Sequence, residues 1–195
     1  MNIVQVIDYF YNAIVDPEKL SQIVAVEERK HFAISAVVIA VVVFMDIVAQ
    51  SLLSVQSGFF YYKLTYGFVA LFLINILCIV LYAGLLTITL QIAGYQASGG
   101  FIINALALAQ IPRMFIVPVV LIFHSLYFAP VFFYSLGSLA LVLWSIIIAM
   151  RCLSQRYSLE PIKAIGYLAA PVIAAGVMGF LIFVAGVMVV IGLLS

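Results

Sequence analysis

Long apolar stretches separated by short polar breaks fill the chain after residue 31. A transmembrane helix needs about 20 mostly apolar residues to cross roughly 30 Å of hydrocarbon, and five of the stretches are long enough. The predicted spans are residues 32–53, 66–90, 101–123, 131–150 and 165–194. The pattern therefore predicts an all-α, polytopic membrane protein whose five transmembrane helices form a bundle.

The first 31 residues have a more polar pattern and are expected to lead into a transmembrane domain of residues 32–195. A secretory signal peptide places basic residues ahead of an apolar stretch. Residues 1–30 instead carry five acidic residues and no such arrangement. We therefore expect this segment to remain in the protein, in the cytoplasm or at the membrane surface.

Two short helices are predicted in this lead-in segment. Apolar side chains in residues 2–15 recur at i, i+3/i+4 and i+7, which is typical of an amphipathic helix. Such a helix lies either on the membrane surface or against its own protein. Asp16-Pro17-Glu18 then provides an N-cap, a proline at the first helical position and an acid in the first turn. This arrangement predicts a second helix that ends near Glu28.

Composition supports a membrane protein and gives no indication of catalysis. Hydrophobic residues make up 68% of the 195 residues and charged residues 8%, whereas a soluble domain carries about 25% charged residues. The net charge is +1 and the sequence has no basic tail, so no nucleic acid partner is expected. Cys78, Cys152, His31 and His124 form no metal-ligand spacing, and no nucleophilic triad, P-loop or dinucleotide motif is present. We therefore expect a non-enzymatic protein without a cofactor.

Basic residues predict how the chain is oriented. Cytoplasmic loops of membrane proteins carry an excess of lysine and arginine, and aromatic side chains favour the headgroup level. With the N-terminus inside, the predicted outer loops hold only Lys63, and aromatic residues gather there at 59–66 and 127–134. The inner segments then hold six basic residues, Lys19, Arg29, Lys30, Arg151, Arg156 and Lys163. The sequence therefore predicts the N-terminus inside and the C-terminus outside.

Two charges interrupt the predicted spans, Asp46 in the first and Arg113 in the third. A charge at the bilayer centre costs at least about 2.5–3.5 kcal/mol, so it usually faces the protein interior and finds a partner. Asp46 lies about 21 Å along the first span and Arg113 about 18 Å along the third, at 1.5 Å per residue. On the same measure, Asn75 lies about 14 Å below the outer edge of the second span. Gln110 lies one turn before Arg113 on the same helix face. We predict that these four side chains form an intramembrane polar cluster.

Three interpretations of this cluster remain open from sequence. The charged pair can fix helix register, it can belong to a transport or ligand site, or the two residues can fail to interact. Pro112 and Pro118 are expected to kink the third span because each removes a backbone donor. In the fifth span, Ala175-x-x-x-Gly179 permits close approach of helices, within the chain or between two copies.

Several short motifs resemble the Yip family, the five-span membrane proteins that interact with Ypt/Rab GTPases, and in particular its compact bacterial branch. They are Asp16-Pro17, the glycine-rich loop before Phe101, Ala107, Ala109, Pro112, Trp144, Ser158, Lys163, Ala164 and Pro171. The resemblance implies a five-helix fold with a cytoplasmic N-terminus, and its bacterial members imply the cell (inner) membrane. Eukaryotic members act in vesicle traffic and bind Rab GTPases. This chain lacks their long N-terminal region and their Asp-Leu-Tyr-Gly-Pro motif, so Rab binding is not expected.

The first functional hypothesis from sequence is a membrane scaffold or adaptor. It would contact a cytoplasmic protein, or a second copy of itself, through the amphipathic N-terminal segment and the loop at residues 151–163. The alternative is a small transporter or channel built around Asp46 and Arg113. A polar cavity that reaches Arg113 would favour the alternative, and a closed, dry bundle would favour the scaffold.

Overall fold

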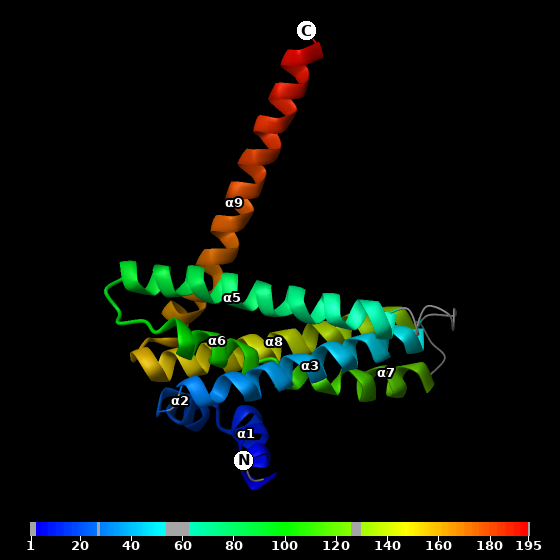
Figure 1. The fold of residues 1–195 in the computed structure, drawn as a ribbon, viewed down its shortest axis with the longest axis vertical. Helices are drawn as coiled ribbons and strands as arrows, with labels where there is room; N and C mark the ends of the chain where they lie inside the picture. The colour runs from blue at the N-terminus through cyan, green and yellow to red at the C-terminus, as the bar shows by residue number, and fades with distance from the viewer. Residues whose placement is uncertain (1–2, 27, 54–62, 126–129, 195) are drawn as a thin grey trace.

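The computed structural model describes residues 3–26, 28–53, 63–125 and 130–194 and is all-helical over them (Figure 1). Its α-helices are α1 Ile3–Val15, α2 Pro17–Val26, α3 Glu28–Leu53, α5 Phe68–Ile92, α6 Gly99–Leu108, α7 Ile116–Ser125, α8 Pro130–Tyr157 and α9 Pro161–Leu194. A π-helix, η1 (Lys63–Gly67), precedes α5, and a 3-10 helix, η2 (Ile111–Phe115), joins α6 to α7.

Five stretches of these helices are long and apolar enough to cross a membrane. They are His31–Leu53, Phe68–Ile92, Gly99–Phe123, Phe132–Tyr157 and Pro161–Met188. The prediction of an all-α chain with five candidate spans is therefore confirmed. The orientation across the membrane stays a prediction, and the aromatic residues expected at 59–62 and 127–128 lie outside the described residues.

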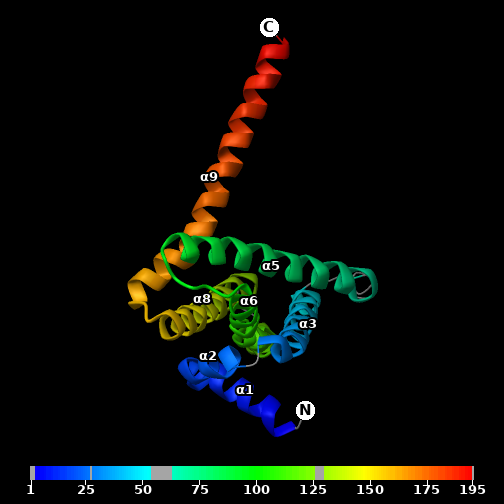
Figure 2. The ribbon, with the colours of Figure 1, turned by 60° about the vertical axis from the view of Figure 1, so that its left-hand side comes forward.

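The core lies around α6, the most buried of the helices. α6 lies between α3 and α8, with α5 over one face of these three and α1 and α2 on the other (Figure 2). The side chains of Phe101, Ile102 and Leu108 on α6 are fully buried, and Leu86 and Leu90 of α5 meet them. Apolar residues on several sides of one helix are typical of a helix surrounded by others. α6 therefore holds the body of the bundle together.

The two short N-terminal helices pack on the bundle as well as on each other. Leu20 and Val24 of α2 are buried, and the Cys152 thiol of α8 donates to the Pro17 carbonyl at 3.3 Å. Asp16 caps α2 by accepting the Lys19 amide at 3.3 Å, and the Lys19 ammonium lies 3.0 Å from the same carboxylate. These hydrogen bonds hold the pKa of the Asp16 carboxyl below its ordinary value. The lead-in segment is thus anchored to α8.

The third span is interrupted rather than smoothly kinked. It consists of α6, a turn at Ala109 and Gln110, η2 and α7. Pro112 lies in η2, where its missing N–H coincides with the break between the two α-helices. Pro118 is the third residue of α7, within the first turn, where a helix leaves its N–H groups without intrahelical acceptors. The interruption therefore lies at Pro112, one residue before Arg113.

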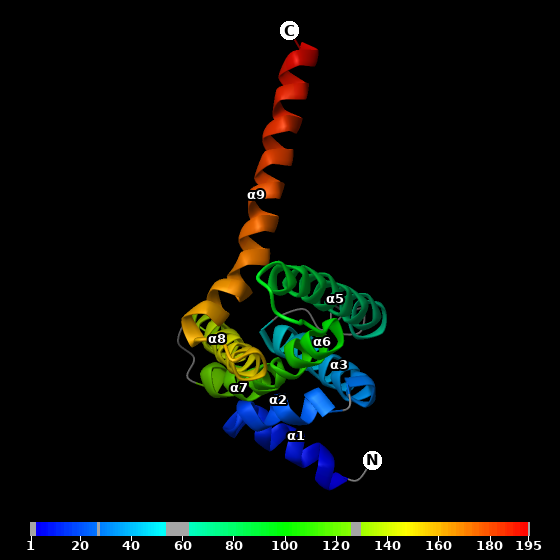
Figure 3. The same ribbon diagram turned by 90° about the vertical axis from the view of Figure 1, so that its left-hand side faces the viewer.

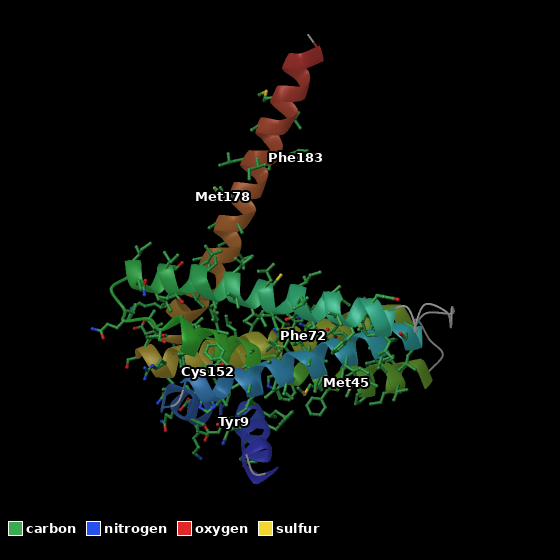
Figure 4. The ribbon with its side chains drawn as sticks, viewed as in Figure 1. Tyr9, Met45, Phe72, Cys152, Met178 and Phe183 are labelled. Carbon is green, nitrogen blue, oxygen red and sulfur yellow. The ribbon has the colours of Figure 1, made fainter. Side chains whose placement is uncertain are left out.

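Over the part whose side chains are described, the last helix, α9, packs on the bundle through its first turns. Ala164, Leu168 and Pro171 are buried against the bundle, whereas residues 172–188 are exposed. Figure 3 shows α9 leaving the bundle on the α5 side, away from α1. Met178 and Phe183 lie on this projecting part, which we call the α9 arm (residues 172–188), far from the other labelled side chains (Figure 4). The arm includes Ala175-x-x-x-Gly179, so this motif makes no close helix contact among the described residues.

Gly137 of α8 lies against Val119 of α7. A Cβ added at Gly137 would overlap Cγ1 of Val119. Because valine is branched at Cβ and stiff about χ1, it cannot turn aside cheaply. Gly137→Ala is therefore expected to destabilise the protein by about 1–3 kcal/mol, measured by unfolding in mixed micelles with the fluorescence of Trp144, the single tryptophan.

The matched control for Gly137 is a second change that restores the space. Combining Gly137→Ala with Val119→Ala removes the overlap, so most of the lost stability should return. A double variant that is no more stable than Gly137→Ala alone would contradict this account of the α7–α8 contact.

Candidate intramembrane polar site

Asp46 of α3 and Arg113 of η2 form an ion pair inside the membrane-spanning region. Nη2 of Arg113 donates to Oδ2 of Asp46 at 2.6 Å. The break at Pro112 places Arg113 on a 3-10 turn between α6 and α7 that contacts α3. The Arg113 side chain is 30% exposed and the Asp46 side chain is 23% exposed. The pair is therefore close and only partly covered by protein.

Asn75 and Gln110 form the second half of the site. Nε2 of Gln110 donates to Oδ1 of Asn75 at 3.4 Å, which joins α5 to the turn before η2. Oε1 of Gln110 is buried and has no hydrogen-bond partner among the described residues. A buried acceptor without a partner costs about 1–3 kcal/mol, so this oxygen has an unmet hydrogen bond.

A cavity of about 500 Å³ opens onto this site between α3 and α5. We call it the α3–α5 groove. All four predicted cluster residues line it, together with two further polar residues. These six are Asp46, Gln50, Asn75, Cys78, Gln110 and Arg113. Its volume is within the range of roughly 300–1,000 Å³ that is usual for small-molecule sites.

A second cavity, of about 520 Å³, is lined mainly by α8 and α9, with Tyr82 as its one residue from α5. We call it the α5–α8 groove, and its walls are mostly apolar, with Ile146 of α8 and Leu168 and Val172 of α9 among them. Tyr82, Leu106, Gln110 and Arg113 line both grooves. The polar site is therefore flanked by one polar and one apolar cavity.

Tyr82 fixes the base of α9 beside these grooves. Its hydroxyl donates to the Leu168 carbonyl at 2.5 Å. Pro171 lies three residues further along α9 and has no N–H to offer to the preceding turn. The tyrosine thus links α5 to the point where α9 leaves the bundle.

A separate polar pair, between Ser35 and Asn104, was not predicted. Oγ of Ser35 donates to Oδ1 of Asn104 at 2.8 Å, and both side chains are buried. The sequence nevertheless places these two side chains at one depth, as it does Asp46 and Arg113. Ser35 lies three residues after Phe32 and Asn104 three residues after Phe101, so the two predicted spans bring them to the same depth.

The structure brings all four predicted cluster residues into one site, as two bonded pairs along one cavity. Among the residues it describes, no group of three or more histidine, cysteine, aspartate or glutamate side chains could hold a metal ion. The chain matches no protein-family model, no curated protein and no solved structure. The chemistry of the site must therefore be argued from its own residues.

Proposed function

We propose that this chain is a non-enzymatic, multi-pass membrane carrier that binds its ligand at the Asp46–Arg113 pair. The observation that carries this proposal is the partial exposure of the pair in a cavity within the membrane-spanning region. Charged groups in hydrocarbon are costly, and intramembrane ionisable residues usually face a water-filled cavity or a pathway. A pair that only fixed helix register would be stable when fully enclosed by protein.

The two charges of the site offset each other. At 2.6 Å the Asp46 carboxylate largely neutralises the Arg113 guanidinium, so the site favours a ligand without a large net charge. Arg113 carries five N–H donors and Asn75 and Gln110 contribute amides, so hydrogen bonds are the main means of recognition. Binding and release would then depend on polar contacts made at the α3–α5 groove.

The proposed location is the cell (inner) membrane, with the N-terminus in the cytoplasm. The positive-inside distribution of basic residues and the resemblance to the compact bacterial branch of the Yip family support this location. The same resemblance gives no ligand, and the proposal takes none from it.

Cys78 provides a direct test, because this native thiol is exposed and lines the α3–α5 groove. In vesicles, a charged methanethiosulfonate reagent applied to both sides is expected to label Cys78, since the reagent reaches only thiols that contact water. The matched control is Leu77→Cys in a Cys78→Ala background. Leu77 is 57% exposed but is outside the groove, so the same reagent should leave it unlabelled.

A second candidate function is the scaffold, and the exposed face of α1 favours it. Tyr11 and Val15 are 59% and 58% exposed at the outer side of the N-terminal helices. Such a face could hold α1 on the membrane surface or on a cytoplasmic protein. A folded protein whose Cys78 resists the charged reagent would have a dry core, which would contradict the carrier and favour the scaffold.

A further inference from the structure

We infer that the ligand of this site is an uncharged amphiphile that enters from the bilayer, with its polar head at Gln110 and Arg113 and its apolar chain in the α5–α8 groove. This inference rests on the proposed function and adds the chemical class of the ligand. It follows from three features of the two grooves, namely their shared residues, their contrasting walls and the buried Gln110 acceptor.

The shared residues make the grooves one composite site. Gln110 and Arg113 line both cavities, so a head bound there can extend a chain into either. The α3–α5 groove supplies the ion pair and three amide side chains, whereas the α5–α8 groove is lined by Val142, Ile146 and other apolar side chains. A polar end beside an apolar channel matches a molecule with a polar head and a hydrocarbon chain.

The polar contacts define the head. Oε1 of Gln110 has no partner within the part of the chain that the structure describes, so it would accept from a donor such as a hydroxyl or an amide N–H once the head displaces the atoms that cover it. Arg113 uses one guanidinium nitrogen for Asp46, and its further N–H groups would suit an acceptor such as an ester carbonyl. A hydroxyl beside an ester is the head of an acylglycerol.

The depth of the site argues against a charged head. Asn75 lies seven residues after the start of α5, about 10 Å along the helix. A phosphate bound this far from the headgroup level would find no free cation to pair with, because Asp46 already neutralises Arg113. An uncharged hydroxyl can be satisfied there by Gln110 alone.

Dioleoylglycerol in phosphatidylcholine nanodiscs is the probe, and native mass spectrometry counts the molecules that stay bound to the released protein. We expect one dioleoylglycerol to be retained, with dioleoylphosphatidic acid, which has the same chains and a charged head, bound about tenfold more weakly. Gln110→Leu should weaken retention about fivefold through the lost hydrogen bond. Ile146→Trp, at the exposed lip of the α5–α8 groove, should abolish it by filling the chain channel.

Ile147→Trp is the matched control, since Ile147 is the next residue of α8 and is 48% exposed but lines neither groove. Its retention should equal that of the unaltered protein. The inference would be overturned if Gln110→Leu and Ile146→Trp retained as much dioleoylglycerol as the unaltered protein. It would also be overturned if no form retained any. If the charged reagent labels Cys78 but no dioleoylglycerol is retained, the proposed carrier function stands and its ligand is water-soluble. If the reagent does not label Cys78, the carrier function itself is overturned.

Discussion

Arg113→Ala is expected to destabilise the protein by about 3–5 kcal/mol, because it leaves the Asp46 carboxylate without its partner inside the membrane. Asp46→Ala should have an effect of similar size for the converse reason. The measurement is the free energy of unfolding in mixed micelles, followed by the fluorescence of Trp144.

The double variant Asp46→Ala/Arg113→Ala decides whether these losses come from the pair. It removes both charges, so its loss should be well below the sum of the two single losses, with a coupling energy of about 0.5–3 kcal/mol. Losses that simply add would show that the two side chains act independently. A loss close to zero for Arg113→Ala would show that water already solvates Asp46 fully.

Phe101→Ala is expected to cost about 3 kcal/mol, because it opens a cavity by truncating the largest of the fully buried side chains that the structure describes. The Phe101 ring is fully buried, meets the Tyr157 ring edge-on with centroids 6.0 Å apart, and lies 5.5 Å beneath the Arg156 guanidinium carbon. The same unfolding measurement applies.

Phe183→Ala is the control for this prediction. Phe183 is 67% exposed on the α9 arm, so its truncation removes no packing within the bundle and should leave the free energy of unfolding unchanged. Equal losses for the two variants would mean that the measured effect comes from contact of phenylalanine with detergent rather than from packing on α6.

Hydrophobic patterning was enough to predict the helices because lipid leaves the backbone few other options. Every N–H and C=O in hydrocarbon needs an internal partner, so an apolar run of span length must be helical. The first predicted span, 32–53, ends with α3 at Leu53, and the fourth, 131–150, continues in the structure to Tyr157. The apolar pattern ends at Arg151 and Arg156, whereas the helix continues past both residues.

The site could be predicted in part because the depth of a residue in the membrane follows from counting residues along its span. Counting residues along two spans placed Asp46 and Arg113 at one level, and the structure joins them. The same counting gives no lateral positions. The second groove depends on which helices lie beside α5, and the contacts of Tyr82 with α9 depend on packing that no periodicity encodes.

The sequence also could not predict that α9 projects from the bundle. Its apolar pattern predicts a helix that needs lipid, and it does not distinguish a helix packed among others from one surrounded by lipid alone. Proline at position 171 was visible, but a proline in a span only marks where a bend is permitted.

The way α9 leaves the bundle has a consequence for biosynthesis. Among the α9 side chains that the structure describes, the buried ones end at Pro171, so a nascent chain that has emerged to this point already contains all of these. The remaining 23 residues, 172–194 with Ser195 beyond them, extend about 35 Å as a helix and are long enough to enter a bilayer unaided. Docking of the bundle and insertion of the last span can therefore be completed as two successive events at the translocon.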